Sequence, residues 1–288
     1  MIKINNEESG GGSYVAPKSK YNEIKNFFPV CVDDFFDDPD RLVNFAKNLP
    51  KEPDLEGRWP GKRTDLLWKI DKDLATAILL KVMSCYYDLT YQNISWKRVN
   101  MCFQEIPTYC KTKNDVRNRG WIHFDAAEEF EIAGLVYLTP DIDPDSGTSL
   151  FKLEKQNDEK YRPDPISWSR QMLHRNKNGV TGYEEEFDEE YFTKKYKEHE
   201  NLFIEKTRFA NIYNRMIMYD TNEFHRANSY YNDVGKDARL TLVFFIGGLN
   251  IDTYPLERPR DKENDEFITK RTLMTHTQHA KIQSDKNK

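Results

Sequence analysis

Two histidines and one aspartate place the strongest constraint on the fold of this chain of 288 residues. His123 and Asp125 are separated by a single residue, whereas His225 follows about 100 residues later. Because alternate side chains of a β-strand point to the same face, His123 and Asp125 can reach one bound group from a single strand end. His225 joins them only if a distant strand lies alongside, as in an antiparallel double-sheet fold. The three residues therefore predict a metal site within a mainly β protein.

Two imidazoles and one carboxylate are the donor set of non-heme iron(II) sites, where they occupy one face of the ion and leave the other positions open. His123 and Asp125 form the only His-x-Asp or His-x-Glu pair in the sequence. A zinc hydrolase could use the same three ligands, but it would also need a general base, for which Glu128 or Glu129 is available. The other four histidines lie in charged or terminal segments, and we expect them at the surface: His174, His199, His276 and His279.

Hydrophobic periodicity predicts two helices early in the chain and strands afterwards. One helix begins at Pro39 with Asp38 as its N-cap, and a second covers 74–87, where apolar residues recur every four positions. The expected strands cover 28–32, 95–104, 120–124, 132–138, 148–153, 208–213, 215–219, 224–227 and 239–247. These elements predict flanking helices around a predominantly β core.

The pattern divides the chain into a flexible N-terminal arm (1–27), one domain (28–252) and a polar C-terminal extension (253–288). A highly charged insert at about 154–206 interrupts the strands and carries aromatic residues at helical spacing. The insert either packs as a helix on the sheet edge or forms a lid that recognises substrate, and both can hold at once.

Arg239 begins an otherwise apolar strand and shares a face with Thr241. A buried arginine is costly unless it is paired, and its planar fork matches a carboxylate bidentately. Taken alone, Arg239 could make a structural ion pair or lie at an exposed strand end. With His123, Asp125 and His225 present, we prefer a role in holding the far carboxylate of a dicarboxylic co-substrate.

In the order and spacing of these motifs the sequence resembles the Fe(II)/2-oxoglutarate dioxygenases, and within them the prolyl-4-hydroxylase-like branch. The resemblance covers about residues 28–250. It rests on His123-x-Asp125, the segments 134–138, 146–151 and 214–219, His225, and Arg239-x-Thr241.

The resemblance implies a double-stranded β-helix (jelly-roll) core with helices packed on one side. It implies that His123, Asp125 and His225 bind Fe(II), that Arg239 binds the C5-carboxylate of 2-oxoglutarate with Thr241 as an added donor, and that O2 is the second co-substrate. Related halogenases replace the aspartate by a small residue, so Asp125 favours hydroxylation. The prolyl hydroxylases usually carry lysine where this chain has Arg239, so a prolyl substrate is not implied.

Three further side chains have two interpretations each. Tyr137 either contacts 2-oxoglutarate or is a core tyrosine with a hydrogen-bonded hydroxyl. Trp121 either lines a substrate pocket or packs in the core. Arg215 either contacts substrate or pairs with an acidic loop.

Composition narrows the partners. The net charge of −5 gives no basic surface for nucleic acid. None of the four cysteines forms a CxxC pair, and no apolar run approaches the roughly 18 residues of a membrane span. We therefore expect a cytoplasmic protein that hydroxylates a peptide side chain or a small metabolite. A jelly-roll binding module without catalysis remains an alternative, but it would not need Arg239 beside a complete metal-binding triad.

Overall fold

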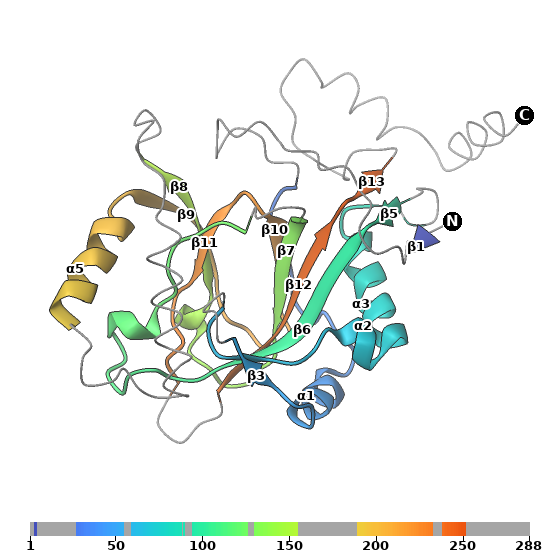
Figure 1. Ribbon diagram of the computed structural model, residues 1–288, viewed down its shortest axis with the longest axis horizontal. Helices are drawn as coiled ribbons and strands as arrows, with labels where there is room; N and C mark the ends of the chain where they lie inside the picture. Colours follow the sequence, from blue (N-terminus) through green and yellow to red (C-terminus); the bar gives the residue numbers. More distant parts are fainter. Residues whose placement is uncertain are drawn as a thin grey trace, which may run out of the picture.

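Two facing β-sheets build the domain in the computed structural model (Figure 1), which describes residues 3–4, 27–54, 59–87, 89, 94–125, 130–154, 189–232 and 238–251. All pairs within both sheets are antiparallel. The larger sheet contains, in spatial order, β2 (Val30–Val32), β10 (Met216–Asp220), β7 (Phe130–Tyr137), β12 (Arg239–Gly247), β6 (Arg98–Ile106), β4 (Lys62–Arg63) and β3 (Glu52–Pro53).

The smaller sheet contains β11 (Phe224–Ala227), β8 (Thr148–Leu153) and β9 (Phe203–Phe209), in that order. A single β-bridge between His123 and His225 adds the segment before Asp125 to its edge. From β7 onward the chain passes to the small sheet for β8 and β9, back to the large sheet for β10, and then through β11 to β12. This alternation is a double-stranded β-helix, so the mainly β jelly-roll fold is confirmed.

Strand β12 shows how the sequence specifies the two layers. Its even-numbered apolar residues join a cluster with the helices, namely Leu240, Leu242, Phe244 and Ile246. The alternate residues point between the sheets, because a strand places successive side chains on opposite faces. Both faces are covered, which explains why this strand reads as an almost continuous apolar run.

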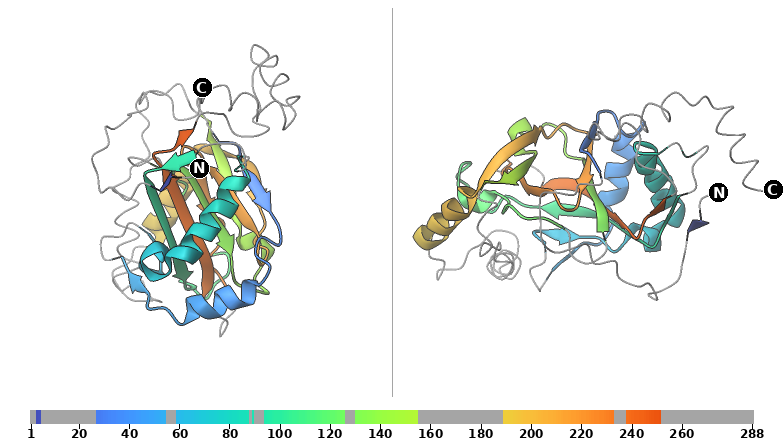
Figure 2. Two further views of the ribbon diagram at one scale, coloured as in Figure 1. Left: turned by 90° about the vertical axis from the view of Figure 1, so that its right-hand side faces the viewer. Right: turned by 90° about the horizontal axis from the view of Figure 1, so that it is seen from above.

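The helices α1 (Pro39–Lys47), α2 (Leu67–Ile70) and α3 (Lys72–Ser84) cover the outer face of the large sheet, on one side of the molecule (Figure 2). The Asp38 carboxylate accepts a hydrogen bond from the Arg41 amide, which confirms the predicted N-cap. Helix α5 (Glu189–Glu200) lies at the opposite end, beside the small sheet (Figures 1 and 2). None of the helices in the described ranges is long and apolar enough to span a membrane.

A small third sheet, formed by β1 (Lys3–Ile4), β5 (Ile94–Trp96) and β13 (Asn250–Ile251), and two short 3-10 helices, η1 (Val116–Asn118) and η2 (Pro144–Ser146), complete the described elements.

Two expected strands differ from the structure. The strand expected at 208–213 runs instead over Phe203–Phe209, where most side chains face solvent and leave no apolar alternation to read. The strand expected at 120–124 is present only as the His123–His225 bridge. Its extended backbone is tied to β11 without forming a regular ladder.

Candidate metal centre

The backbone brings the three predicted ligands together. The amide of His123 donates to the carbonyl of His225 (3.0 Å), and the amide of His225 donates to the carbonyl of His123 (2.7 Å). Residues paired in this way project their side chains to the same face, and the two imidazole centroids lie 4.4 Å apart. Asp125 returns to that face two residues later, where its amide donates to the Thr221 carbonyl (2.9 Å).

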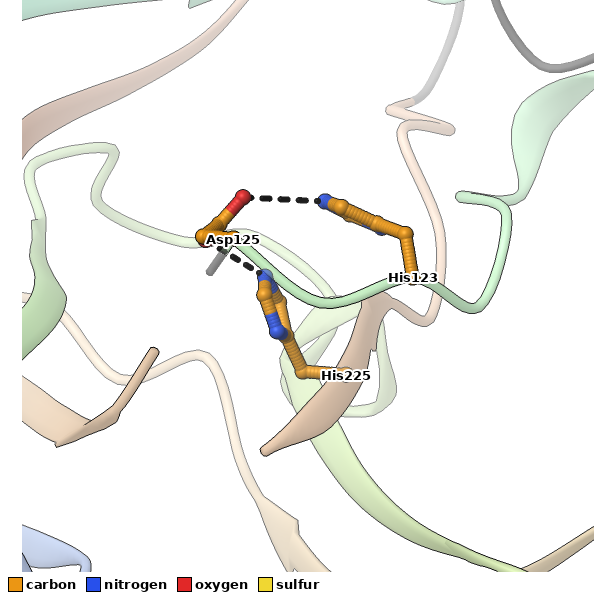
Figure 3. Close-up of side chains that lie close together, drawn as sticks. All are labelled: His123, Asp125 and His225. Carbon is orange, nitrogen blue, oxygen red and sulfur yellow. Dashed lines mark ion pairs between the residues drawn. The ribbon is translucent and has the colours of Figure 1, made fainter. Parts of the chain in front are cut away.

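The three side chains converge on one point (Figure 3). Asp125 Oδ1 lies 3.6 Å from His123 Nε2, and Asp125 Oδ2 lies 3.1 Å from His225 Nε2. One ligand atom from each residue falls within 4.8 Å of the others. Two atoms bound at right angles, each about 2.1 Å from an ion, would lie about 3 Å apart. The donor set and its spacing therefore fit a divalent transition-metal ion on one shared face.

Hydrogen bonds to the backbone orient both imidazoles. The Nδ1 atom of His123 lies 2.7 Å from the Trp121 carbonyl, and that of His225 lies 2.9 Å from the Glu223 carbonyl. A carbonyl oxygen only accepts, so each Nδ1 carries the hydrogen. The Nε2 atoms are then the ligating atoms, and the carbonyls fix ring orientation as second partners of metal-binding histidines commonly do.

The electrostatics of the triad prepare it for a cation. Burial opposes the ionisation of Asp125, but the charge of His225 and the hydrogen bond from it hold the pKa of Asp125 at about 2. Burial and the neighbouring His225 lower the pKa of His123 to about 4. Burial acts against the charged form of His225 too, yet Asp125 raises its pKa. The low pKa of Asp125 keeps its carboxylate in the anionic form that binds a cation.

Arg239 is the second feature of the interior. Its side chain is 2% exposed, and the described part of the chain offers it neither a hydrogen bond nor an ion pair. Its guanidinium carbon lies 5.5 Å from the centre of the Tyr137 ring and 5.9 Å from that of Tyr230. Aromatic faces compensate only part of the cost of burying a cation. A buried arginine without a counter-ion is therefore suited to receive an anion.

Arg239 and the metal ligands face the same interior. Thr241, on the same face as Arg239, is paired with Tyr137 across β12 and β7. Tyr137 packs against Leu150, which is the strand partner of His225. The structure therefore places all six predicted site residues on the inner side of the two sheets. The Tyr137 hydroxyl donates to Thr148 Oγ1 (2.8 Å), so the core interpretation accounts for its polar atom, while its ring contacts Arg239.

Helix α5 fixes the outer side of the metal-binding segments. His199 Nε2 donates to the Ile122 carbonyl (2.8 Å), and the Tyr196 hydroxyl donates to the Gly120 carbonyl (3.0 Å). Arg226, which follows the ligand His225, donates to the Tyr196 hydroxyl (2.7 Å) and pairs with Glu200 at 2.6 Å. The helix is thereby bonded to both segments that supply ligands.

His199 corrects one prediction. We expected it at the surface, but its side chain is 7% exposed and its ring stacks on Trp121 with centroids 4.2 Å apart. Its charged sequence neighbours concealed this position, although the aromatic spacing of the segment did indicate a packed helix face. Trp121 is accordingly a packing residue against α5.

Arg215 pairs with Asp33 (2.9 Å) at the end of the large sheet, which favours the ion-pair interpretation. Glu128 and Glu129, proposed as bases of a hydrolase, lie outside the described residues. The same holds for His174, His276 and His279, and for most of the 154–206 insert before α5.

Comparison with protein families gives one match. The profile of a family described as "Family of unknown function (DUF6445)" matches residues 23–246. A search of curated proteins finds no match.

Several solved structures are similar to this chain at low sequence identity. A prolyl hydroxylase from Trichoplax adhaerens, solved in complex with a peptide of the hypoxia-inducible factor oxygen degradation domain, is 10% identical, with 76% of this chain and 83% of that chain covered and a TM-score of 0.42. HygX from Streptomyces hygroscopicus, with nickel and 2-oxoglutarate bound, is 9% identical, with 77% and 84% covered and a TM-score of 0.43. EvdO2 from Micromonospora carbonacea var. aurantiaca is 9% identical, with 87% and 97% covered and a TM-score of 0.44.

Proposed function

The chain belongs to the DUF6445 family, whose function is unknown, and we propose that it is an Fe(II)- and 2-oxoglutarate-dependent oxygenase. It hydroxylates a C–H bond of a small metabolite or a peptide side chain, and releases succinate and CO2. The observation that carries this proposal is Arg239, a buried guanidinium for which the described residues provide no counter-ion, and which faces the same interior as a complete His/Asp/His triad.

The alternatives leave this arginine unexplained. A jelly-roll binding module needs neither the triad nor a buried cation. A zinc hydrolase could use the triad but has no use for an anion site inside the β-helix. A dicarboxylate co-substrate explains both features, because one end can approach the metal while the other meets Arg239.

Each residue has a definite task in this proposal. His123, Asp125 and His225 hold the metal, and their backbone hydrogen bonds keep both Nε2 atoms directed at it. Arg239 binds the distal carboxylate through charge-assisted hydrogen bonds, and Thr241 adds a hydroxyl. Iron with 2-oxoglutarate and O2, when bound, supplies the oxidising power for the hydroxylation.

Buried apolar side chains surround these groups. Leu150 and Ile217 line the interior and are 1% and 0% exposed. The Tyr219 ring packs against His225 with centroids 4.8 Å apart. Excluding water in this way strengthens the attraction between Arg239 and a carboxylate, and protects a reactive centre from side reactions.

The metal ligands remain reachable from one side. The side chains of His123 and Asp125 are 32% and 22% exposed, while that of His225 is 8% exposed. The substrate that is oxidised would therefore approach from the side of His123 and Asp125, and the co-substrate would occupy the closed interior.

An anaerobic titration tests the proposal. The purified metal-free protein receives Fe(II) and then 2-oxoglutarate, and the visible charge-transfer band of a chelated keto acid is recorded. We expect the band in the wild type, no band in Asp125→Ala, and a band only at much higher 2-oxoglutarate concentration in Arg239→Met. Arg215→Met is the matched control, because it removes an arginine that directly precedes β10 of the same sheet and is paired with Asp33. Absence of the band in the wild type would reject the oxygenase.

A further inference from the structure

Tyr219 of β10 is a polar side chain of the interior to which neither the metal-binding triad nor the anion site assigns a task. It is 3% exposed and belongs to a buried cluster with Tyr137, Leu150 and Ile217. The preceding residue, Met218, packs instead in the cluster on the helix side of the large sheet. Because successive side chains of a strand point to opposite faces, Tyr219 points between the two sheets.

The hydroxyl of Tyr219 makes no hydrogen bond within the described part of the chain. It is not one of the unpaired polar atoms that the described residues enclose completely, so an acceptor has room beside it. The hydroxyl of Tyr137, in the same cluster, donates to Thr148 Oγ1 (2.8 Å). A buried hydroxyl without a partner is unfavourable, and phenylalanine would supply the same ring without it. A ligand that accepts this hydrogen bond would account for a tyrosine here.

Tyr219 stands at the metal end of the interior. Its ring packs against that of His225, with centroids 4.8 Å apart and an angle of 49° between the planes. Its strand partner on β7 is Ala133, four residues before Tyr137. That separation is about 13 Å along the strand, and the Tyr137 ring is the one that contacts Arg239. The unpaired hydroxyl and the buried guanidinium therefore reach the interior from two different ends.

The electrostatic surroundings agree with this position. Burial, and then the charge of Asp125, raise the pKa of Tyr219, whereas the charge of Arg239 lowers it. The phenol is thus within electrostatic reach of both ends of the interior. A tyrosine with the ordinary pKa of about 10 is already protonated at neutral pH, so the hydroxyl is a donor for an anionic oxygen.

We propose that the Tyr219 hydroxyl donates a hydrogen bond to the metal-binding end of the dicarboxylic co-substrate. The inference rests on the proposed function, in which that end meets the triad and Arg239 takes the distal carboxylate. A third fixed contact would leave the co-substrate one orientation in the closed interior. The substrate that is oxidised is not the acceptor, because it approaches from the exposed side of His123 and Asp125, whereas Tyr219 packs on the buried His225.

Two keto acids separate the two ends. 2-Oxoglutarate carries both, whereas 2-oxobutyrate has the metal-binding end and lacks the distal carboxylate, so it is titrated to higher concentration. The charge-transfer band is recorded with Fe(II) without oxygen, and calorimetry with Mn(II) gives Kd values without turnover. Tyr219→Phe removes only the hydroxyl. Tyr86→Phe is the matched control, because its hydroxyl donates to the Phe28 carbonyl (2.7 Å) in the cluster on the helix side of the large sheet.

Tyr219→Phe should raise the Kd of both keto acids about 10- to 100-fold, the range for a hydrogen bond to a charged group. It should also move the band to shorter wavelength, because the keto acid loses a hydrogen bond that stabilises its electron-accepting end. Arg239→Met should weaken 2-oxoglutarate alone. Tyr86→Phe should change neither the Kd values nor the band, although it breaks a hydrogen bond and lowers the melting temperature. Tyr219→Phe breaks no hydrogen bond of the described residues, so it should melt like the wild type.

The outcomes separate this inference from the function on which it rests. If the wild type gives no band with Fe(II) and 2-oxoglutarate, the oxygenase proposal fails. If the band forms and Tyr219→Phe binds both keto acids as the wild type does, the role of Tyr219 is wrong. A loss confined to 2-oxoglutarate, with an unmoved band, would place the hydroxyl at the distal carboxylate instead. An equal loss of Mn(II) affinity without any keto acid would show that Tyr219 supports the ligand His225, and would also overturn the inference.

Discussion

Replacing Arg239 by methionine should make the metal-free protein more stable and at the same time abolish tight binding of 2-oxoglutarate. Arg239 is 2% exposed and has no ion-pair partner in the described part of the chain. In the described part of the chain, its guanidinium lies over the rings of Tyr137 and Tyr230. Methionine keeps a long unbranched chain and removes the charge.

The magnitudes follow from these contacts. Burying an ion costs several kcal/mol even after relaxation, and apolar replacement of buried ionic groups often raises stability by about 1–4 kcal/mol. The two aromatic faces offset about 0.5–2 kcal/mol each, so the net gain lies at the lower end of that range. Each kcal/mol raises the melting temperature of a domain of this size by about 2–4 °C.

The loss of the carboxylate partner acts on the ligand. Hydrogen bonds to a charged group are worth about 1.5–3 kcal/mol, so the Kd for 2-oxoglutarate should rise about 10- to 100-fold. At a concentration 100 times the wild-type Kd, 2-oxoglutarate adds about 2.7 kcal/mol to wild-type stability. A 100-fold weaker variant would gain only about 0.4 kcal/mol at that concentration.

Urea unfolding with and without Mn(II) and 2-oxoglutarate measures both effects without turnover. Arg215→Met is the control: it breaks the ion pair with Asp33 outside the interior, so it should lower stability and leave the ligand effect intact. A metal-free Arg239→Met protein that is less stable than the wild type by several kcal/mol would refute the reasoning. It would mean that Arg239 is a structural cation rather than an anion receptor.

Three further changes test the surroundings of the site. Burial lowers the pKa of His199 to about 4 from an unfolded value near 6.5. The free energy of unfolding should therefore fall by about 3 kcal/mol as the pH drops from 6.5 towards 4, because the unfolded state takes up the proton first. Urea unfolding of His199→Gln, which keeps a donor for the Ile122 carbonyl, should show a smaller loss of stability over this pH range than the wild type. Gly61→Ala should lower the free energy of unfolding by about 1–3 kcal/mol, because the φ of +71° and the close Glu105 carbonyl exclude a Cβ atom. An unchanged melting temperature would show that the turn at residues 59–63 can adjust to a side chain. Mn(II) at 100 times its Kd should add about 2.7 kcal/mol to the stability of the wild type, and calorimetry should detect no such binding to Asp125→Ala.

The strands that the sequence predicted best are those with buried neighbours on both sides. The segments 148–153, 224–227 and 239–247 coincide with β8, β11 and β12. Strands β8 and β12 each lie between two other strands, so their apolar runs reflect burial directly, and the edge strand β11 is covered on its other side by the bridge to His123. Strand β9 lies at the edge of the small sheet and exposes most of its side chains. Its sequence therefore lacks the alternation of apolar and polar residues that marks a strand, and the predicted strand began five residues late.

The proximity of the three candidate ligands was predictable only in part from local sequence. Strand periodicity places His123 and Asp125 on one face, whereas His225 joins them only through the tertiary pairing with His123. The burial of His199 depends on where α5 packs, and the charged residues around it suggested a surface position. The row of paired residues from Arg63 to Tyr137 across the large sheet depends on the register of three strand pairs. Register is fixed by tertiary pairing and could not be read from the segment 59–63.

The candidate metal centre depends on the insert because its first two candidate ligands, His123 and Asp125, do not lie in a regular strand. The segment before Asp125 is attached to β11 by one bridge, and a single bridge leaves most of its carbonyls available. Tyr196 and His199 of α5 take the carbonyls of Gly120 and Ile122. The helix that ends the insert thus replaces the missing ladder on the outer side of the ligands. A change in the position of α5 would therefore act on the metal-binding segment directly, through two hydrogen bonds.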